Sequence, residues 1–405
     1  MIVLKFGGTS VKSAARIKNV ATIIAKAAET DSVLAVVSAM GDTTDYLVKL
    51  GQQISRTPNR RELDMLLSTG EQISIALVAM ALNEAGKKAI SMTGAQLGIL
   101  TENVHAAARI VDIKTERIQQ YLNDGYSIIA AGFQGVTVEG DVTTLGRGGS
   151  DTTAVALAAA LQARVCDIYT DVSGVYTADP NLVPTARLLK EVAYEEMLEL
   201  ARVGAQVLHP RAVELARKHK IPVRVRNTFS PDAEGTILRG ADDMEIYRPV
   251  SGVTVDKNQA RIAILKVPDQ PGIAGKVFGA LAEHHISVDM IIQAFHQDRS
   301  VNDITFTIKS DNLESSRTII EEIAQAIGAE GVLADEDVAK ISIVGAKLMD
   351  TPEPAAKMFA ELGKQGINIK MISTSDIRIS CAISNLDAER AVRAVHDLFH
   401  LDEEE

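Results

Sequence analysis

The sequence predicts an α/β protein with a mainly parallel sheet between helical layers, followed by two ferredoxin-like βαββαβ modules. From residue 1 to about 240, short and continuously apolar runs alternate with helical patterns. Strands that lack polar alternation are buried on both faces, which is typical of parallel sheets covered by helices. After about residue 245 the polarity pattern changes and an internal repeat begins. The chain of 405 residues therefore divides into a larger first part and a duplicated second part.

The first part contains six expected strands, each a short run of apolar residues. They lie at 2–6, 32–38, 88–92, 127–131, 165–170 and 222–226. Helical patterns occupy 11–28, 43–55, 62–84, 112–124, 151–163, 194–202 and 210–219. Because ligands gather at the carboxyl ends of the strands in such a sheet, we expect the functional residues to follow directly after strands.

The second part contains one pattern twice, at 269–291 and at 350–372. Identical residues recur at an offset of 81, from Asp269 and Asp350 to Ile291 and Ile372. The same elements flank each copy, with strands at 261–267, 340–344, 303–308 and 377–383 and helices at 313–327 and 387–399. This order completes to two βαββαβ modules. Such duplicated modules more often bind effectors or mediate association than carry chemistry.

Composition excludes several classes of function. The net charge is −11 and Lys and Arg form no block, so we expect no nucleic-acid partner. Cys166 and Cys381 lie far apart and fit no metal or CxxC spacing, which favours a reducing compartment. The apolar stretches 73–82 and 154–161 are too short to span a bilayer, and no basic, apolar leader opens the chain. We expect a cytoplasmic protein that acts on small molecules without a membrane partner.

The first ten residues predict an anion site. Lys5 lies in the first strand, Gly7-Gly8 ends it, and Thr9-Ser10 offers hydroxyls to cap the next helix. Glycine lets a phosphate approach the backbone N–H groups at the positive end of a helix. The Walker pattern GxxxxGK[ST] is absent from the sequence, so phosphate binding here is of another kind. The alternative is an ordinary strand–turn–helix connection.

Two further segments carry candidate ligand-binding groups. The loop Ser38-Ala-Met-Gly-Asp-Thr-Thr-Asp45 follows the second strand and supplies hydroxyls and backbone donors, although an ordinary βα loop is the alternative. Glu71 lies in the otherwise apolar helix 62–84. Because an unpaired buried carboxylate is costly, Glu71 requires a cation. That cation is either a substrate ammonium or a partner in an internal salt bridge.

The loop Thr143-Thr-Leu-Gly-Arg-Gly-Gly-Ser-Asp-Thr152 is the strongest signal in the chain. Three glycines let the backbone close around a ligand, Arg147 supplies a planar fork for a carboxylate, and Ser150-Asp151 can cap the following helix. The segment 170–180 follows another strand and offers an aromatic ring and carboxylates to a nucleotide. Together these loops suggest a polyanion beside a molecule with a carboxylate and an ammonium. Phosphoryl transfer to an amino acid fits that pair best.

Six motifs then resemble those of the aspartokinases, a branch of the amino-acid kinase family. They are KFGGTS at 5–10, SAMGDTTD at 38–45, Gly70-Glu71, TTLGRGGSDTTA at 143–154, TDVSGVYTADP at 170–180 and VLHPRAVE at 207–214. The resemblance covers the whole chain, because the repeat is similar to the paired ACT domains of that family. It implies an amino-acid kinase domain at 1–240, a first ACT domain at 262–335, and a second that joins 245–260 with 339–405.

The resemblance also implies a role for residues at matching positions. Catalysis is expected of Lys5, Arg147 and Asp151. ATP is expected at Lys5, Gly7, Gly8, Ser38, Ser150, Thr170, Asp171, Tyr176 and Asp179, with Mg²⁺ bridging the phosphates and no metal-ligating residues assigned. Aspartate is expected at Thr44, Glu71, Arg147, Gly148, Gly149 and Ser150, and Ser38 is also expected to help hold it. Arg147 would hold the α-carboxylate and Glu71 the ammonium.

The implied activity is ATP-dependent phosphorylation of L-aspartate to 4-phospho-L-aspartate. This reaction is the first step of lysine, threonine and methionine biosynthesis, with feedback by lysine, threonine or both at the ACT domains. The rivals are a kinase of glutamate or acetylglutamate and a non-enzymatic amino-acid sensor. An ammonium partner for Glu71 disfavours an acetylated amine, and the ACT pair disfavours the glutamate enzyme. An intact N-terminal site disfavours a pure sensor.

Effector binding is expected at nine residues of the ACT pair: Asp269, Ile273, Ala274, Asp289, Gln293, Asn368, Ile369, Thr374 and Ser375. In the second copy Glu353 replaces a glycine and Pro354 removes an N–H, so we expect strong binding at the first type of site alone. A homo-oligomer through the ACT domains is implied, with an α2β2 variant if an ACT-only chain starts near Met244.

Two positions depart from the resemblance. Asn181 and Gln206 stand where many members carry Arg and Lys near the nucleotide. Arg187 or Lys190 is the expected substitute for the missing charge.

Overall fold

The computed structural model describes residues 1–204, 207–241, 249–295, 300–346, 348 and 352–403. Gln206, Met244 and Asp350, which the sequence singled out, lie outside the described residues. Contacts divide the chain into two units. The first comprises Met1–Val175, Leu188–Ala201 and Gln206–Glu245, and the second comprises Tyr176–Arg187, Arg202–Ala205 and Ile246–Glu405.

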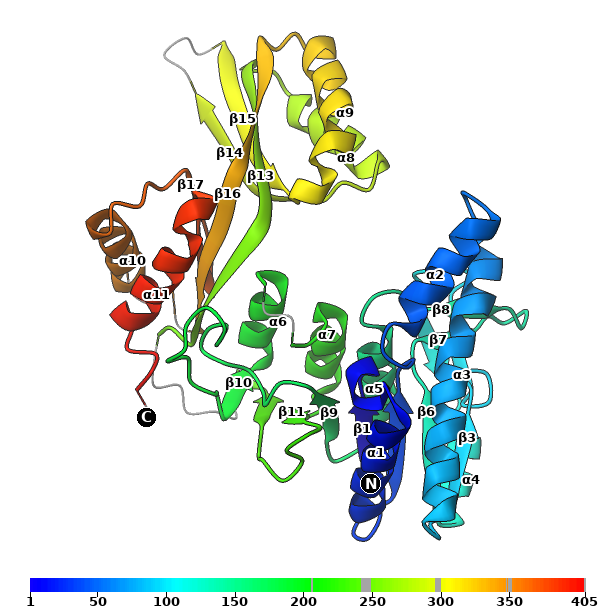
Figure 1. Cartoon of the computed structure of the whole chain (residues 1–405). Coiled ribbons are helices and arrows are strands. Elements are labelled where there is room, and N and C mark those ends of the chain that lie inside the picture. Colours follow the sequence, from blue (N-terminus) through cyan, green and yellow to red (C-terminus); the bar gives the residue numbers. More distant parts are fainter. Residues whose placement is uncertain (205–206, 242–248, 296–299, 347, 349–351, 404–405) are drawn as a thin grey trace. The chain divides into compact units, whose positions relative to one another are not determined.

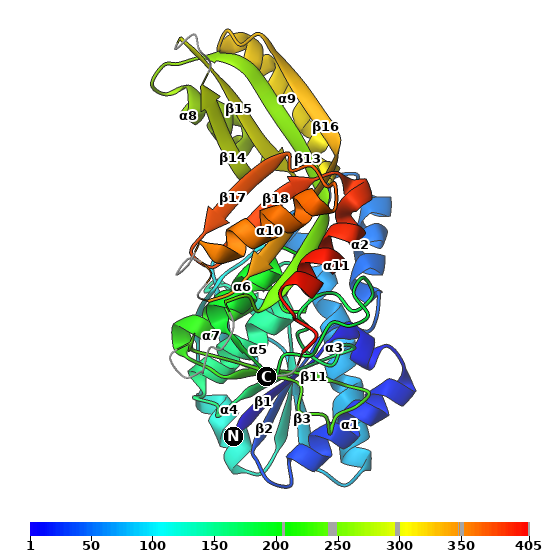
Figure 2. The same ribbon diagram turned by 90° about the vertical axis from the view of Figure 1, so that its left-hand side faces the viewer.

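A sheet that contains the strands labelled β1, β9 and β11 in Figure 1 forms the centre of the first unit, and Figure 2 gives a second view of it. It has eight strands in the order β10-β12-β11-β9-β1-β2-β6-β3. Neighbouring strands run parallel except β11 and β12. The strands are β1 (Ile2–Phe6), β2 (Val33–Val37), β3 (Ala89–Met92), β6 (Ser127–Ala131), β9 (Cys166–Thr170), β10 (Glu191–Ala193), β11 (Val223–Asn227) and β12 (Thr236–Arg239). The six predicted strands are all present, and the prediction of a mainly parallel sheet is confirmed.

Helices cover both faces of this sheet. Leu4 and Phe6 of β1 pack in a core with helices α1 (Ala14–Ala27) and α3 (Arg60–Glu84). Since side chains alternate along a strand, Lys5 points to the other face, where α5 (Gly149–Ala160) lies against β1 and β2. The other helices of this unit are α2 (Thr43–Ile54), α4 (Glu116–Asn123), α6 (Tyr194–Arg202) and α7 (Pro210–His219).

A second, four-stranded sheet was not predicted. Its order is β5-β4-β7-β8, with β4 (Ile99–Thr101), β5 (Ile110–Ile113), β7 (Gln134–Val136) and β8 (Val142–Thr144). The predicted helix at 112–124 is wrong over its first residues, which belong to β5. Strands of three or four residues are too short to show a period in the sequence, so their pairing comes from tertiary contacts.

Two predicted helix caps are also wrong. The segment after Gly7 first forms a 3₁₀ helix (Gly8–Val11), and Ser13 caps α1 by accepting a hydrogen bond from the Arg16 N–H. The Ser10 hydroxyl instead bonds Thr228 at 2.6 Å. Gly148 is the N-cap of α5 at φ +67°, so Ser150 and Asp151 lie in its first turn.

Helix α3 is, by length and composition alone, sufficient to cross a membrane. Half of its most apolar stretch is buried inside the protein, where it packs against α1, α2 and β8. Its buried Asp64 and Glu71 bind backbone groups of neighbouring loops, as expected of a core helix.

The second unit is built on one six-stranded sheet with the order β14-β15-β13-β16-β18-β17. Two long strands, β13 (Gly252–Pro268) and β16 (Gly331–Val344), pair along both repeats. The first repeat adds α8 (Ile273–Glu283), β14 (Val288–Phe295), β15 (Val301–Ile308) and α9 (Leu313–Ala326). The second adds α10 (Glu353–Lys364), β17 (Met371–Ser375), β18 (Arg378–Ile383) and α11 (Ala388–Leu398). The two βαββαβ modules of the predicted fold are thus confirmed.

Residues 176–187 pack with the second repeat. Ala178 and Val183 belong to its apolar core, and the Thr177 hydroxyl lies 2.9 Å from Nε2 of the buried His396. Burial lowers the pKa of His396.

Candidate active site

The predicted site residues of the first unit gather where its parallel strands end. Gly7 follows β1, Ser38 follows β2, and Thr170 ends β9. Backbone hydrogen bonds tie these ends together, from the Gly7 N–H to Tyr169 and from the Ser38 N–H to Phe6. In these loops the predicted site residues therefore lie at or directly after the ends of strands, as expected from the sequence.

Lys5 and the glycine-rich loop at 146–149 converge on the same face of the sheet. The Lys5 ammonium lies 2.6 Å from a carboxylate oxygen of Asp151, and both side chains are largely buried. Asp151 lies in the first turn of α5, directly after the Arg147-bearing loop. The pairing places a cation, a helix N-terminus and a glycine-rich loop together, which suits a phosphate in transfer.

Close packing against Ala39 explains Gly8 in the first loop and Gly70 in helix α3. A Cβ at Gly8 would lie 2.9 Å from the Ala39 carbonyl oxygen, and one at Gly70 would lie 2.9 Å from the Ala39 side chain. The Gly41 N–H also donates to the Gly8 carbonyl. The loop after β2 is therefore clamped between the Gly7-Gly8 turn and helix α3.

Glu71 lies directly beneath this clamped loop. Its side chain is 3 % exposed, and one carboxylate oxygen accepts the Ala39 N–H at 3.1 Å. The other oxygen, Oε2, has no hydrogen-bond partner among the described residues. The internal salt bridge that was the alternative at this position is not found in the described part of the chain, and the ligand cation at Glu71 stays a prediction.

Burial raises the pKa of Glu71 to about 7, against the lowering effect of the hydrogen bond from Ala39. A ligand ammonium would favour the ionised carboxylate, so a substrate that carries an ammonium would bind the ionised enzyme. We expect kcat/KM for an amino-acid substrate to fall as the pH drops below about 7, approaching tenfold per unit. The measurement is that profile from pH 5.5 to 8.5, with Glu71→Gln as a variant in which the fall disappears. A flat wild-type profile across pH 7 would contradict this assignment.

Residues from two distant segments press on the glycine-rich loop at 146–149. A Cβ at Gly146 would lie 3.0 Å from the Ala106 carbonyl, and one at Gly148 would lie 2.0 Å from the His209 ring. Both glycines have positive φ, +74° and +67°. The loop therefore requires glycine for its backbone and for the neighbours that press on it.

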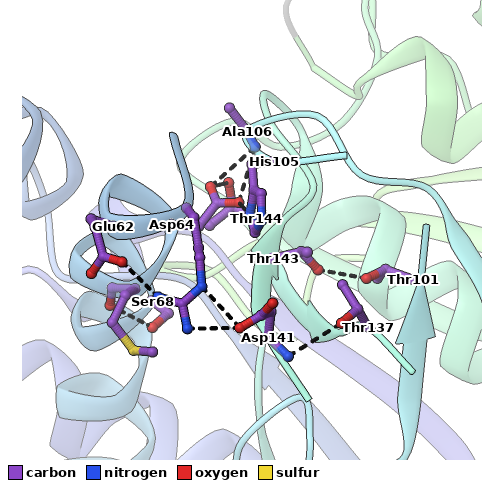
Figure 3. Close-up of polar contacts among 12 residues, drawn as sticks. Glu62, Asp64, Ser68, Thr101, His105, Ala106, Thr137, Asp141, Thr143 and Thr144 are labelled. Carbon is purple, nitrogen blue, oxygen red and sulfur yellow. Dashed lines mark hydrogen bonds and ion pairs between the residues drawn. The ribbon is translucent and has the colours of Figure 1, made fainter. Parts of the chain in front are cut away.

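Asp64 was not predicted as a site residue, and it binds Thr144 and the 105–106 segment, which lie next to this loop (Figure 3). The fully buried Asp64 carboxylate accepts hydrogen bonds from the Thr144 hydroxyl at 2.5 Å and the Ala106 N–H at 3.0 Å, and it lies 2.8 Å from Nδ1 of His105. The available signal was its spacing: Asp64 precedes Glu71 by two helical turns, on the same face of an apolar helix.

The candidate nucleotide residues fall in both units. Thr170 and Asp171 follow β9 in the first unit, where the Thr170 hydroxyl donates to Asp171 at 3.2 Å. Tyr176 and Asp179 belong to the second unit. Asn181, at a position that departs from the resemblance, donates from its side chain to Asp179 at 3.0 Å. The roles of these residues stay predictions.

The predicted effector residues lie in the second unit. Gly272 is the N-cap of α8, with φ +92° and open space around it. At the corresponding position of the second repeat, Glu353 begins α10 and pairs with Lys357 at 2.7 Å. Asp289 pairs with the buried Lys340, so an effector ammonium at Asp289 would compete with an existing cation. Asn368, Thr374 and Ser375 are exposed on the second repeat.

Comparison with known proteins assigns both parts of the chain. The family model described as the amino acid kinase family matches residues 1–227, and two ACT domain models match 261–328 and 341–399. An aspartokinase of Bacillus sp. (strain MGA3) is 48 % identical over 402 residues, 99 % of this chain and 97 % of that protein. An aspartokinase of Thermus thermophilus is 48 % identical over 404 residues, 99 % of each chain.

Solved structures agree with this assignment. Escherichia coli aspartokinase III in complex with aspartate and ADP (R-state) has a TM-score of 0.82 at 27 % identity, covering 99 % of this chain and 100 % of that one. The same enzyme in complex with lysine and aspartate (T-state) has a TM-score of 0.79 at 27 % identity, covering 98 % and 99 %.

Proposed function

Because this chain belongs to the aspartokinase family and is a kinase, we propose that it transfers the γ-phosphoryl group of ATP to the β-carboxylate of L-aspartate. The products are 4-phospho-L-aspartate and ADP. One observation carries the choice of an amino acid with a free ammonium: the buried Oε2 of Glu71 has no hydrogen-bond partner among the described residues. A ligand cation would satisfy this oxygen.

Charge neutralisation is the main task of the site. The β-carboxylate is ionised at neutral pH and attacks the γ-phosphorus without a general base, while the bond from phosphorus to the ADP oxygen breaks. Lys5, which lies 2.6 Å from Asp151, would offset the repulsion between the β-carboxylate and the γ-phosphate, which are both negatively charged. Arg147 would hold the α-carboxylate through its planar fork.

ATP is the proposed phosphoryl donor, and Mg²⁺ would accompany it on the phosphate oxygens. No cluster of three or more His, Cys, Asp or Glu side chains suited to a metal occurs in the residues that the structure covers. This fits a metal carried largely by the nucleotide, because Mg²⁺ is commonly bound by substrate phosphates and one or two carboxylates. Bound there, it would offset phosphate charge.

Regulation by lysine, threonine or both at the ACT modules is the second part of the proposal. The lysine complex of the Escherichia coli relative supports lysine, and the open Gly272 loop supports the first repeat as the stronger site. We also propose a cytoplasmic enzyme at the head of lysine, threonine and methionine biosynthesis. Its assembly would be a homo-oligomer through the ACT modules. Intact mass of the purified assembly distinguishes this from an α2β2 form with a chain starting near Met244.

A coupled assay of ADP release tests the activity. Aspartate should support turnover, whereas glutamate and N-acetylglutamate should support little. N-acetylglutamate in particular lacks the ammonium that Glu71 requires. Each substrate is assayed with and without lysine and threonine. Aspartate-independent ADP release, or a preference for N-acetylglutamate, would refute the proposal. Turnover that neither effector changes would remove its regulatory part alone.

A further inference from the structure

The motif at 207–214 has no role in the reaction as proposed above, yet the structure joins it to the Arg147 loop. This motif ends in α7, which begins at Pro210 and packs against α5. His209 caps α7, and its Nδ1 accepts the Arg211 N–H at 3.3 Å. The cap fixes where the side chains of His209 and Arg211 leave the helix.

Arg211 binds the backbone on the approach to Arg147. One guanidinium nitrogen donates to the Leu145 carbonyl at 2.6 Å, and another donates to the Ala108 carbonyl at 3.2 Å. Leu145 and Ala108 are fully buried, so their carbonyls need such a donor. The Ala108 N–H in turn donates to Thr144. The half-buried Arg211 side chain thus links helix α7 to the end of strand β8 and to the segment before β5.

His209 holds the other side of the same loop. Its ring occupies the space where a Gly148 side chain would be. Burial lowers the pKa of His209, and the charges of Arg211 and Arg147 lower it further while Asp151 opposes them. His209 therefore lies in the field of both Arg147 and Asp151, and its ring packs against the loop.

We propose that Arg211 is a positioning residue for aspartate binding, which it serves by fixing the Leu145–Gly148 backbone from which Arg147 projects. The inference rests on the proposed function, since it takes aspartate as the ligand of Arg147. A fixed backbone matters here because the Arg147 guanidinium would bind a carboxylate less tightly if the backbone that carries it shifted. The effect should be specific to the amino acid, because Arg211 makes no described contact with the Gly7-Gly8 turn.

The test compares Arg211→Met, Arg211→Lys and Arg211→Ala in the full-length enzyme. We expect Arg211→Met to raise KM for aspartate at least about tenfold, the loss typical of charge-assisted hydrogen bonds, with KM for ATP nearly unchanged. The KM of Arg211→Lys for aspartate should lie between those of the wild type and Arg211→Met, since an ammonium cannot span both carbonyls. Millimolar guanidinium should partly restore the aspartate KM of Arg211→Ala, whereas urea should not.

Arg217→Met is the matched control, on the same helix and at an exposed side chain. It should leave both KM values unchanged. An unchanged aspartate KM in Arg211→Met, or equal rises for both substrates with a lowered melting temperature, would overturn the positioning role and leave the proposed function intact. Absence of aspartate-dependent turnover in the wild type would instead refute the proposed function.

Discussion

Replacing Lys5 by methionine is expected to lower kcat by roughly 10³-fold or more, the scale seen when a preorganised donor to developing charge is removed. In the proposed reaction the carboxylate nucleophile and the triphosphate are both anions, and Lys5 is the cation that we propose to lie between them. The reaction needs no covalent intermediate, so charge neutralisation accounts for a large part of the barrier. Steady-state turnover at saturating aspartate and ATP measures the effect.

A second variant separates this loss from damage to the fold. Lys5→Met leaves the largely buried Asp151 carboxylate without its partner, which destabilises the protein. Lys5→Met/Asp151→Asn removes both charges and should recover the melting temperature while kcat stays low. Lys18→Met, at an exposed position of α1, is the control for loss of a lysine. A Lys5→Met enzyme with near-normal kcat would contradict the role of Lys5.

Gly148→Ala should have the second largest effect. Alanine pays about 1–2 kcal/mol to adopt a left-handed conformation, and its Cβ would lie 2.0 Å from the His209 ring, which adds roughly 1–3 kcal/mol of overpacking. The ring cannot retreat freely, because His209 caps α7. We expect a lower melting temperature together with a raised KM for aspartate.

Gly86→Ala measures the destabilisation that comes from the left-handed backbone alone, without the overpacking expected at Gly148. Gly86 has φ +72°, close to the +67° of Gly148, but its added Cβ would meet nothing within 4 Å. This control should lose a small part of the stability and none of the activity. If Gly148→Ala behaved like Gly86→Ala in a thermal melt and in the assay, the packing of His209 against the loop would be irrelevant.

Sequence reasoning succeeded where a strand, a glycine turn and a charged residue follow one another along the chain. Lys5 and the Arg147 loop were expected at one place because parallel strands end at one edge of a sheet. Glu71 was recognised as anomalous because a carboxylate on an apolar helical face must be paired. Both predictions could be made from neighbouring residues in the sequence together with one general rule of protein structure.

Sequence reasoning failed where the deciding contact comes from far along the chain. The short strands β4, β5, β7 and β8 owe their pairing to partners in other segments. Ser10 was expected to cap a helix, yet it bonds Thr228. Asp64 and Arg211 each bind a segment remote in sequence. The spacing of Asp64 from Glu71 marks its face of the helix, but it does not identify these distant partners.

The long strands β13 and β16 have a consequence for the order in which the regulatory part can form during synthesis. Residues 252–256 of β13 pair with 340–344 of β16, so the earliest segment of the second repeat must wait for a partner made after the whole first repeat. Distant pairings of this kind form slowly and leave edges unprotected in the meantime. A nascent chain released before β16 would therefore expose the beginning of β13, a point at which chaperones would be expected to bind.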